Sequence, residues 1–128
     1  MEPKELKYSK EHEWIKLDGE TAIVGITDFA QKQLTDIVFV ELPEKGKHAT
    51  ASKPMAVIES VKSVSDIFAP LSGEIVDVNT KLQDNPEIIN KDPYGDGWMV
   101  KIKLENKEEL DSLMGFEEYE KLAKSESH

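Results

Sequence analysis

Several kinds of residue and motif are missing from the 128-residue chain, and each absence narrows its chemistry. There is no cysteine, which excludes disulfides and thiolate metal sites. No run of 18 apolar residues occurs, so no membrane-spanning helix is expected. The glycines form neither a G-x-G-x-x-G fingerprint nor a P-loop. The first residues lack the apolar core of a signal peptide and the composition of a transit peptide, so we expect a cytoplasmic protein of a bacterium or archaeon.

Catalytic and metal-binding side chains are equally scarce. The three histidines are His12, His48 and His128, and no two of them have the spacing of metal ligands. His12 lies between two glutamates, a setting more typical of a surface strand than of an acid–base or metal site. No nucleophile–base–acid set is visible either. We therefore expect a protein that has no catalytic apparatus of its own and binds no metal.

Acidic residues dominate the charge, with 26 Asp and Glu against 16 Lys and Arg, a net charge of −10. Such a chain is repelled by phosphate backbones, so nucleic acid is not an expected partner. The charge favours electropositive protein surfaces, although solubility alone explains it equally well. The length fits one domain over residues 1–128, with a core over about 6–104 and C-terminal helices over about 106–124.

Short β-strands separated by glycine and proline turns account for most of the chain. Polar and apolar residues alternate, which predicts strands at 12–17, 20–26, 36–42, 73–78 and 98–104. The segment 79–96 is rich in Asn, Asp and Pro and is expected to be a loop. This pattern predicts a mainly β fold with peripheral short helices, arranged as a small sandwich or flattened barrel.

Helix-start signals occur at two places. Asp28 is the expected N-cap of a short helix, and Gln31 completes a capping box three residues later. Asn106 is expected to cap a second helix, with Glu109 reaching back to it. A last helix is expected after Gly115, where apolar residues recur on one face, and the tail 124–128 is expected to be frayed.

A β-hairpin is predicted in the middle of the chain, within residues 55–75. Two strand-like runs, 55–58 and 67–69, flank a polar segment whose centre is Lys62. A lysine in a turn is most simply a solvated surface residue. However, Val61 and Val64 are apolar where turns favour Gly, Asn or Asp, and the usual Asn-Gly or Asp-Gly pair is missing. We therefore hypothesise that the tip presents the Lys62 amine to a partner.

An ordered series of short motifs runs through the chain around this hairpin. The motifs are H-E-W at 12–14, V-G-I-T-D-F-A-Q at 24–31, V-E-L-P at 40–43, E-S-V-K at 59–62, A-P-L-S-G-E-I at 69–75, I-N-K-D at 89–92 and G-D-G-W at 95–98. In this order the series resembles the glycine cleavage system H-protein family over about residues 6–124. The resemblance implies a lipoyl- or biotinyl-carrier-like barrel-sandwich hybrid of two antiparallel sheets.

The resemblance also implies a function, that of a non-catalytic lipoyl carrier. Lipoate would be held in amide linkage to Lys62 by a lipoate-attaching enzyme. The arm would receive the aminomethyl group of glycine from a pyridoxal-phosphate-dependent glycine decarboxylase and pass it to a folate-dependent aminomethyltransferase. A flavin-dependent dihydrolipoamide dehydrogenase would then reoxidise it. We expect the carrier to be a monomer.

Four further residues are candidates for roles around the arm. In the resembled family the loaded arm folds into a cleft on the carrier, and Glu13, Asp66 and the neutral acceptor Gln33 are the expected cleft residues. Glu59 is expected to be exposed beside the tip, where it would contribute to recognition by the lipoate-attaching enzyme. A solvated glutamate with no such role is the alternative for Glu59, and the alternative for Glu13 and Asp66 is that they only keep their strands soluble.

The chain departs from the family at two places. Thr35 stands where the family commonly has glycine, so a glycine-only backbone conformation is not expected there. Phe29 and Gln33 stand where some relatives have histidine, which argues against a histidine contact to the arm. Two other kinds of carrier remain open: a biotinyl carrier, although the lysine lacks flanking methionines, and a carrier of another lipoate-linked pathway, which would share this hairpin. An enzyme in its own right is least favoured.

Overall fold

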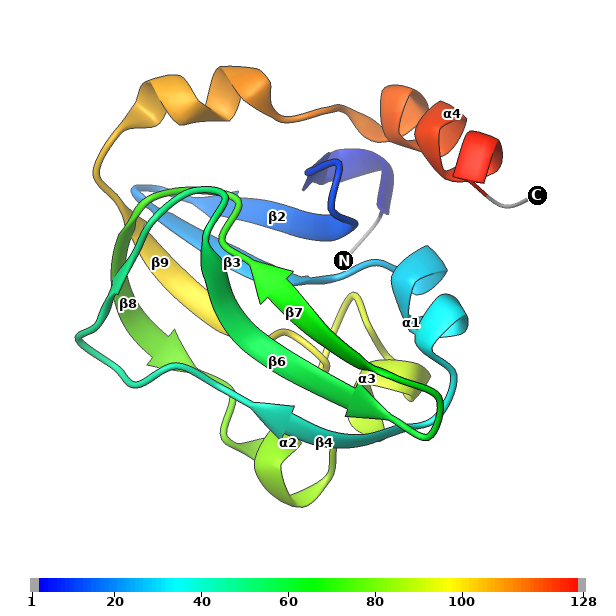
Figure 1. Ribbon diagram of the computed structural model, residues 1–128. Helices are drawn as coiled ribbons and strands as arrows, with labels where there is room; N and C mark the ends of the chain where they lie inside the picture. Colours follow the sequence, from blue (N-terminus) through cyan, green and yellow to red (C-terminus); the bar gives the residue numbers. More distant parts are fainter. Residues whose placement is uncertain (1–2, 127–128) are drawn as a thin grey trace.

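The computed structural model, which describes residues 3–126, consists of two antiparallel sheets with short helices at their edges (Figure 1). The larger sheet has the strand order β1-β2-β3-β9-β8-β5 and the smaller one β4-β6-β7. The strands are β1 (Lys7–Tyr8), β2 (Glu13–Asp18), β3 (Thr21–Ile26), β4 (Ile37–Glu41), β5 (His48–Ala49), β6 (Pro54–Ser60), β7 (Val64–Phe68), β8 (Gly73–Val78) and β9 (Val100–Leu104). The predicted fold class is confirmed, and within the described residues neither sheet closes into a barrel.

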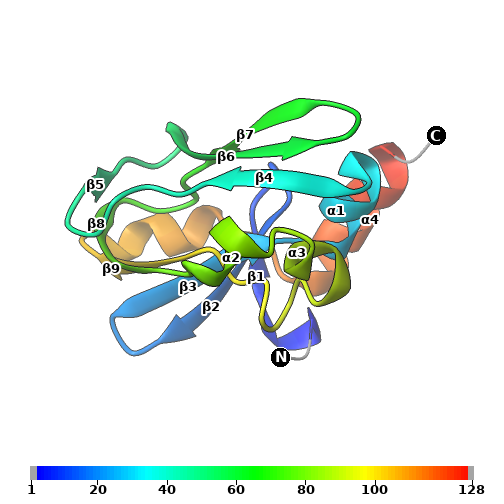
Figure 2. The same cartoon turned by 90° about the horizontal axis from the view of Figure 1, so that it is seen from below.

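The core lies between the two sheets because alternate side chains of each strand point inward. In β6, Ala56 and Ile58 are buried, whereas Glu59 is exposed. Val24 of β3 and Ile102 of β9 reach the same core from the larger sheet. Figure 2 shows the small sheet as one layer, with the larger sheet and the helices on its other side. No helix in residues 3–126 crosses the outer face of the small sheet.

The helices are short and lie at the edges of the sheets. They are η1 (Pro3–Glu5), α1 (Asp28–Leu34), α2 (Lys81–Asp84), α3 (Ile88–Lys91), η2 (Lys107–Ser112) and α4 (Phe116–Glu126). The prediction of a loop over 79–96 is therefore wrong, because α2 and α3 are too short to show a helical period and each buries one side chain, Leu82 and Ile89. The last helix is confirmed. It continues to Glu126, so of the tail expected to be frayed only 127–128 lie outside the described residues.

Neither of the two expected capping boxes forms. The N-cap of α1 is Thr27, whose side chain accepts from the backbone N–H of Ala30. The N–H of Asp28, the expected cap, donates to the Tyr94 hydroxyl, and the Gln31 amide nitrogen donates to the Asp28 carboxylate, so the expected capping box does not form. Asn106 does cap η2. Glu109, however, accepts hydrogen bonds at 2.7 and 2.8 Å from the backbone and hydroxyl of Ser72. Its carboxylate thus ties η2 to the start of β8 and is not available for a capping box.

The backbone at Thr35, between α1 and β4, also differs from expectation. Its φ of 64° and ψ of −148° lie in a region that glycine favours, so the expectation of an ordinary conformation is wrong. Asn90 of α3 holds this connection in place. Its amide nitrogen donates to the Thr35 carbonyl at 2.8 Å, and its amide oxygen accepts from the N–H of Ile37 at 3.0 Å. These two contacts from a distant residue hold Thr35 in a strained conformation beside the hairpin.

Candidate functional site

The turn of the β6–β7 hairpin lies at one end of the small sheet (Figure 1), and Lys62 in this turn is exposed to solvent. The last paired residues are Glu59 and Val64, so residues 60–63 form the tip as predicted. Val61 and Val64 are 68% and 66% exposed on either side of the lysine. The apolar residues that were unexpected in a turn are therefore solvent-exposed and do not contribute to the core.

Ser60 organises the turn, a role the sequence analysis missed. Its buried hydroxyl accepts from the backbone N–H groups of Lys62 at 3.1 Å and Ser63 at 3.0 Å. The N–H of Ser60 donates to the Ser63 carbonyl at 2.8 Å, and that of Val61 donates to the Asp36 carbonyl at 3.0 Å. All four backbone N–H groups of the tip thus have acceptors. The backbone that carries Lys62 is held without the glycine or asparagine typical of such turns.

The Lys62 side chain leans toward the C-terminal end of α1. Its Nζ lies 3.4 Å from the backbone carbonyl oxygen of Gln33, which is in the last turn of that helix. Carbonyls at a helix C-terminus carry partial negative charge and favour an ammonium group. None of the ion pairs within residues 3–126 involves Lys62. The amine is therefore exposed and held by one weak neutral contact, which leaves it open to an acylating enzyme.

A cavity of about 270 Å³ lies between α1 and β7, next to the tip. Two of the expected cleft residues, Gln33 and Asp66, line it together. The remaining lining residues are Glu11, His12, Ile26, Phe29, Ala30, Leu34, Ser65, Ile67 and Glu126. Apolar side chains from α1 and β7 thus form part of the wall, and carboxylates stand at several points of the lining. Such a cavity suits an apolar chain that ends in a cationic group.

Glu13, the third expected cleft residue, is separated from this cavity. Its side chain is 1% exposed and does not line the cavity. The carboxylate accepts a 2.5 Å hydrogen bond from the Ser9 hydroxyl and another from the backbone N–H of Phe68, at the end of β7. Burial raises the pKa of Glu13 from 4.5 to about 7, and these hydrogen bonds oppose the rise only in part. Glu13 thus links the two sheets and is not an open acceptor on the cavity wall.

The expectation that His12 is an ordinary residue of a surface strand is wrong. It lines the cavity, and its ring packs on Phe29 with centroids 4.8 Å apart. Its Nδ1 shares a 2.8 Å hydrogen bond with the Tyr119 hydroxyl, and its Nε2 lies 2.9 Å from Glu126. A histidine therefore borders the cavity although Phe29 and Gln33 are not histidines. No local pattern could reveal this, since 107 residues separate His12 from Tyr119.

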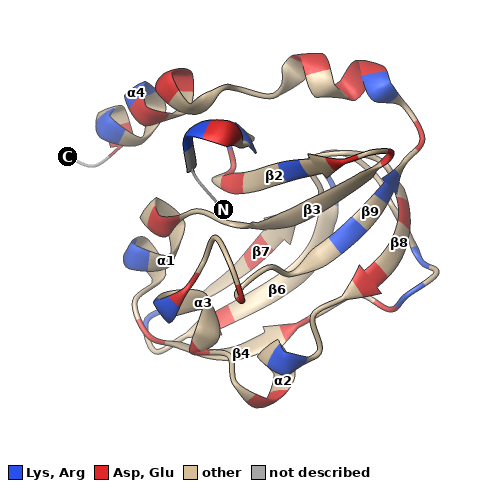
Figure 3. Cartoon of the chain, turned by 180° about the vertical axis from the view of Figure 1, so that it is seen from behind, with Lys and Arg blue, Asp and Glu red and all other residues tan. Residues whose placement is uncertain are grey.

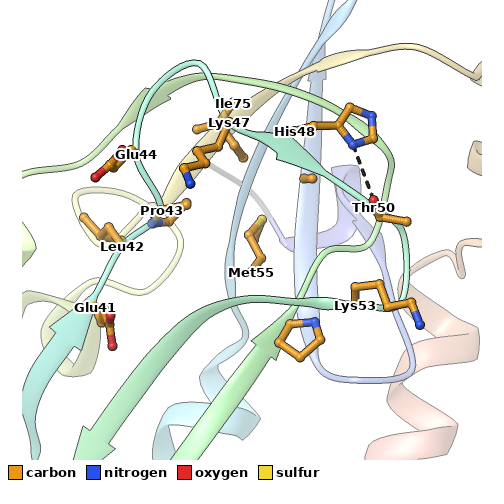
Figure 4. A pocket seen from close by; sticks show the side chains of 12 residues that line it. Glu41, Leu42, Pro43, Glu44, Lys47, His48, Thr50, Lys53, Met55 and Ile75 are labelled. Carbon is orange, nitrogen blue, oxygen red and sulfur yellow. Dashed lines mark hydrogen bonds between the residues drawn. The ribbon is translucent and has the colours of Figure 1, made fainter.

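A second cavity, of about 400 Å³, lies at the other end of β6 from the tip (Figure 4). Met55 lies near its centre, while Lys53 points away from it and the His48 ring turns toward Thr50. Nothing in this lining bears on the chemistry of Lys62. In residues 3–126 no three His, Asp or Glu side chains are grouped to hold a metal ion, and no helix is long and apolar enough to span a membrane.

Comparison with known proteins identifies the family. Residues 6–126 match the family model described as glycine cleavage H-protein. The chain belongs to this family. It is 55% identical to the glycine cleavage system H protein of Carboxydothermus hydrogenoformans over 97% of this chain and 95% of the relative, and 56% identical to that of Halothermothrix orenii over 91% of each. A crystal structure of the H protein of Mycobacterium marinum superposes with a TM-score of 0.83 at 39% identity, covering 91% of this chain and 94% of that one.

Membership of the H-protein family confirms the class of function inferred from the motifs. H proteins are the lipoate-carrying, non-catalytic component of the glycine cleavage system. The biotinyl carrier and the independent enzyme are thereby set aside. The fit of lipoate to this chain is supported by its own geometry, because Lys62 is exposed on a hydrogen-bonded tip beside a cavity whose wall is partly apolar.

Proposed function

We propose that Lys62 is the attachment site and that its lipoyl arm serves glycine decarboxylase, aminomethyltransferase and dihydrolipoamide dehydrogenase in turn. The observation that carries the proposal is the tip itself: its backbone N–H groups all have acceptors, and the lysine amine is exposed. When attached, lipoate supplies a disulfide-containing ring that accepts the aminomethyl group of glycine. A tethered group meets successive active sites at high effective concentration, so a rigid base for the arm suits the task.

Attachment is an acyl transfer to the Lys62 nitrogen. The ammonium group first loses a proton, because only the neutral amine is nucleophilic. The nitrogen then attacks the carbonyl carbon of an activated lipoyl donor, a mixed anhydride or a thioester. The new N–C bond forms, the bond to the leaving group breaks with its electron pair, and a second proton leaves the nitrogen. The product amide is neutral, so the contact with the Gln33 carbonyl loses its charge.

Gln33 and Asp66 are the residues we propose to shelter the loaded arm. Both line the cavity next to the tip, and the Asp66 carboxylate is the better acceptor for a cationic amine. Exclusion of water from the cavity would slow loss of the amine between partners. Glu13 is not proposed to contact the loaded arm, since its carboxylate is buried and hydrogen-bonded to Ser9 and to the backbone of Phe68.

Glu59 is exposed beside the tip, which supports its proposed part in recognition by the lipoate-attaching enzyme. We further propose a monomer in a bacterial or archaeal cytoplasm.

Replacement of Lys62 tests the attachment site. Lys62→Arg keeps the positive charge but removes the acylatable amine, so incubation with lipoate, ATP and a lipoate–protein ligase should leave its mass unchanged. The parent protein and the control Lys53→Arg should each gain the mass of one lipoyl group. Lipoylation of the Lys62→Arg protein at another lysine, such as Lys53 or Lys81, would contradict the assignment.

A further inference from the structure

Exposed hydrophobic side chains are gathered around Lys62. Within residues 3–126 five large ones are exposed, and four of these lie on the hairpin or on β4, its neighbour in the small sheet. We call these four residues the apolar collar: Val38, Phe39, Val61 and Val64, which are 49% to 68% exposed. The fifth, Leu17, lies on the larger sheet. Single exposed hydrophobic residues are ordinary, but a contiguous group marks an interaction site.

The strand register places members of the collar in one row. Phe39 of β4 pairs with Glu59 of β6, and Glu59 pairs with Val64 of β7. Directly paired residues of neighbouring strands turn their side chains to the same face, which here is the outer face of the small sheet. The hydrogen bond from the Val61 N–H to the Asp36 carbonyl brings the start of β4 against the tip. Val61 and Val64 therefore flank Lys62 in the chain, and Phe39 lies on the same face as Val64 with Glu59 between them.

Charge around the collar is of one sign. Segments 36–41 and 57–68 contain four acidic residues, Asp36, Glu41, Glu59 and Asp66, and their only basic residue is Lys62 itself. The back of the molecule differs, because lysines of β9 stand there among carboxylates (Figure 3). A protein that covers the collar must therefore present an apolar surface with a basic rim.

We propose that the apolar collar and its carboxylates form the docking surface for the lipoate-attaching enzyme, an inference that rests on the proposed function of Lys62. The site of reaction selects this occupant. An enzyme that acylates the lysine must bring its bound donor to bonding distance of Nζ, so it has to cover the tip and the row behind it. The enzymes that use the finished arm react at its far end and not at Nζ, so only the attaching enzyme has to reach the lysine nitrogen itself.

The test is the Michaelis constant for the carrier in lipoylation by a purified ATP-dependent lipoate–protein ligase, followed by intact-mass measurement. Val61→Thr combined with Val64→Thr keeps the branched shape and the strand preference but adds hydroxyls that docking would desolvate. We expect KM to rise roughly tenfold with kcat unchanged. Phe39→Thr should act in the same direction. Leu17→Thr is the matched control, since Leu17 is exposed on the other sheet, and its KM should equal that of the parent.

Ionic strength gives a second, independent readout. If a basic rim meets the carboxylates, KM of the parent should rise with salt, and Glu59→Gln combined with Glu41→Gln should weaken that dependence. A KM for the threonine variants equal to that of the parent would overturn the proposal, as would a loss confined to kcat. Either result would leave the Lys62 assignment intact, because that depends only on whether Lys62→Arg is modified. The variants should unfold at the parent's temperature, since the side chains are exposed.

Discussion

The Ser60 hydroxyl accepts a 3.1 Å hydrogen bond from the backbone N–H of Lys62. It also accepts from Ser63 and donates to the Ser63 carbonyl, so one buried side chain closes the whole turn. The position of the lysine is thereby determined by its own hairpin, before any partner binds. Pre-organisation of this kind lowers the entropy lost when an enzyme captures the tip.

Loss of the Ser60 hydroxyl should slow lipoylation. Ser60→Ala leaves the N–H groups of Lys62 and Ser63 without their acceptor, which allows the tip to leave the competent conformation. We expect kcat/KM for lipoylation to fall roughly tenfold. Ser63→Ala is the control, because the Ser63 hydroxyl makes no hydrogen bond within residues 3–126. Equal rates for the two variants would show that Ser60 does not position the lysine. Mass-spectrometric time courses measure both.

Buried Glu13 should make stability fall as pH rises from about 5 to 8. Its folded pKa of about 7 exceeds the ordinary value of 4.5, so in this window the folded state binds more protons than the unfolded state. Deprotonation at Glu13 should cost as much as about 3 kcal/mol above pH 7. Glu13→Gln removes this titration, whereas the exposed control Glu59→Gln does not. Urea unfolding at several pH values should show a flatter profile for Glu13→Gln alone, and parallel profiles would contradict the raised pKa.

Relief of the strained backbone at Thr35 should stabilise the protein. A β-carbon at φ 64° and ψ −148° is unfavourable, and glycine adopts this conformation without that cost. Thr35→Gly should raise the free energy of unfolding by about 1 kcal/mol, after allowance for the added flexibility of the unfolded chain. Thr35→Ala keeps the β-carbon and should bring no gain. A loss of stability in Thr35→Gly relative to Thr35→Ala, measured by urea unfolding, would rule out strain at this residue.

Asp66 should protect the loaded arm. Asp66→Asn keeps the size of the side chain but replaces a charged acceptor with a neutral one, so the aminomethylated carrier should release ammonia several-fold faster. Glu59→Gln is the control, since Glu59 does not line the cavity. Ammonia release from protein that is already loaded separates this effect from any change in lipoylation. Identical release from both variants and the parent would exclude sheltering by Asp66.

Local patterns were sufficient to predict the parts of the fold that depend on neighbours in the chain. The apolar runs at 55–58 and 67–69 identified the hairpin, and the motif around Lys62 identified the attachment residue proposed here. The errors came from contacts between distant segments. The Glu13 carboxylate accepts a hydrogen bond from the backbone of Phe68, 55 residues later, and His12 contacts Tyr119 of α4. The backbone of Thr35 depends on Asn90, which no pattern at residue 35 reveals.

We expect lipoate to be carried on Lys62 alone. Intact-mass measurement and peptide mapping of the protein purified from its native host test it most directly. We expect a mass increase of one lipoyl group, located on the peptide that contains Lys62. Lipoate on a different lysine, or a protein with unmodified Lys62 from cells that are actively cleaving glycine, would contradict it.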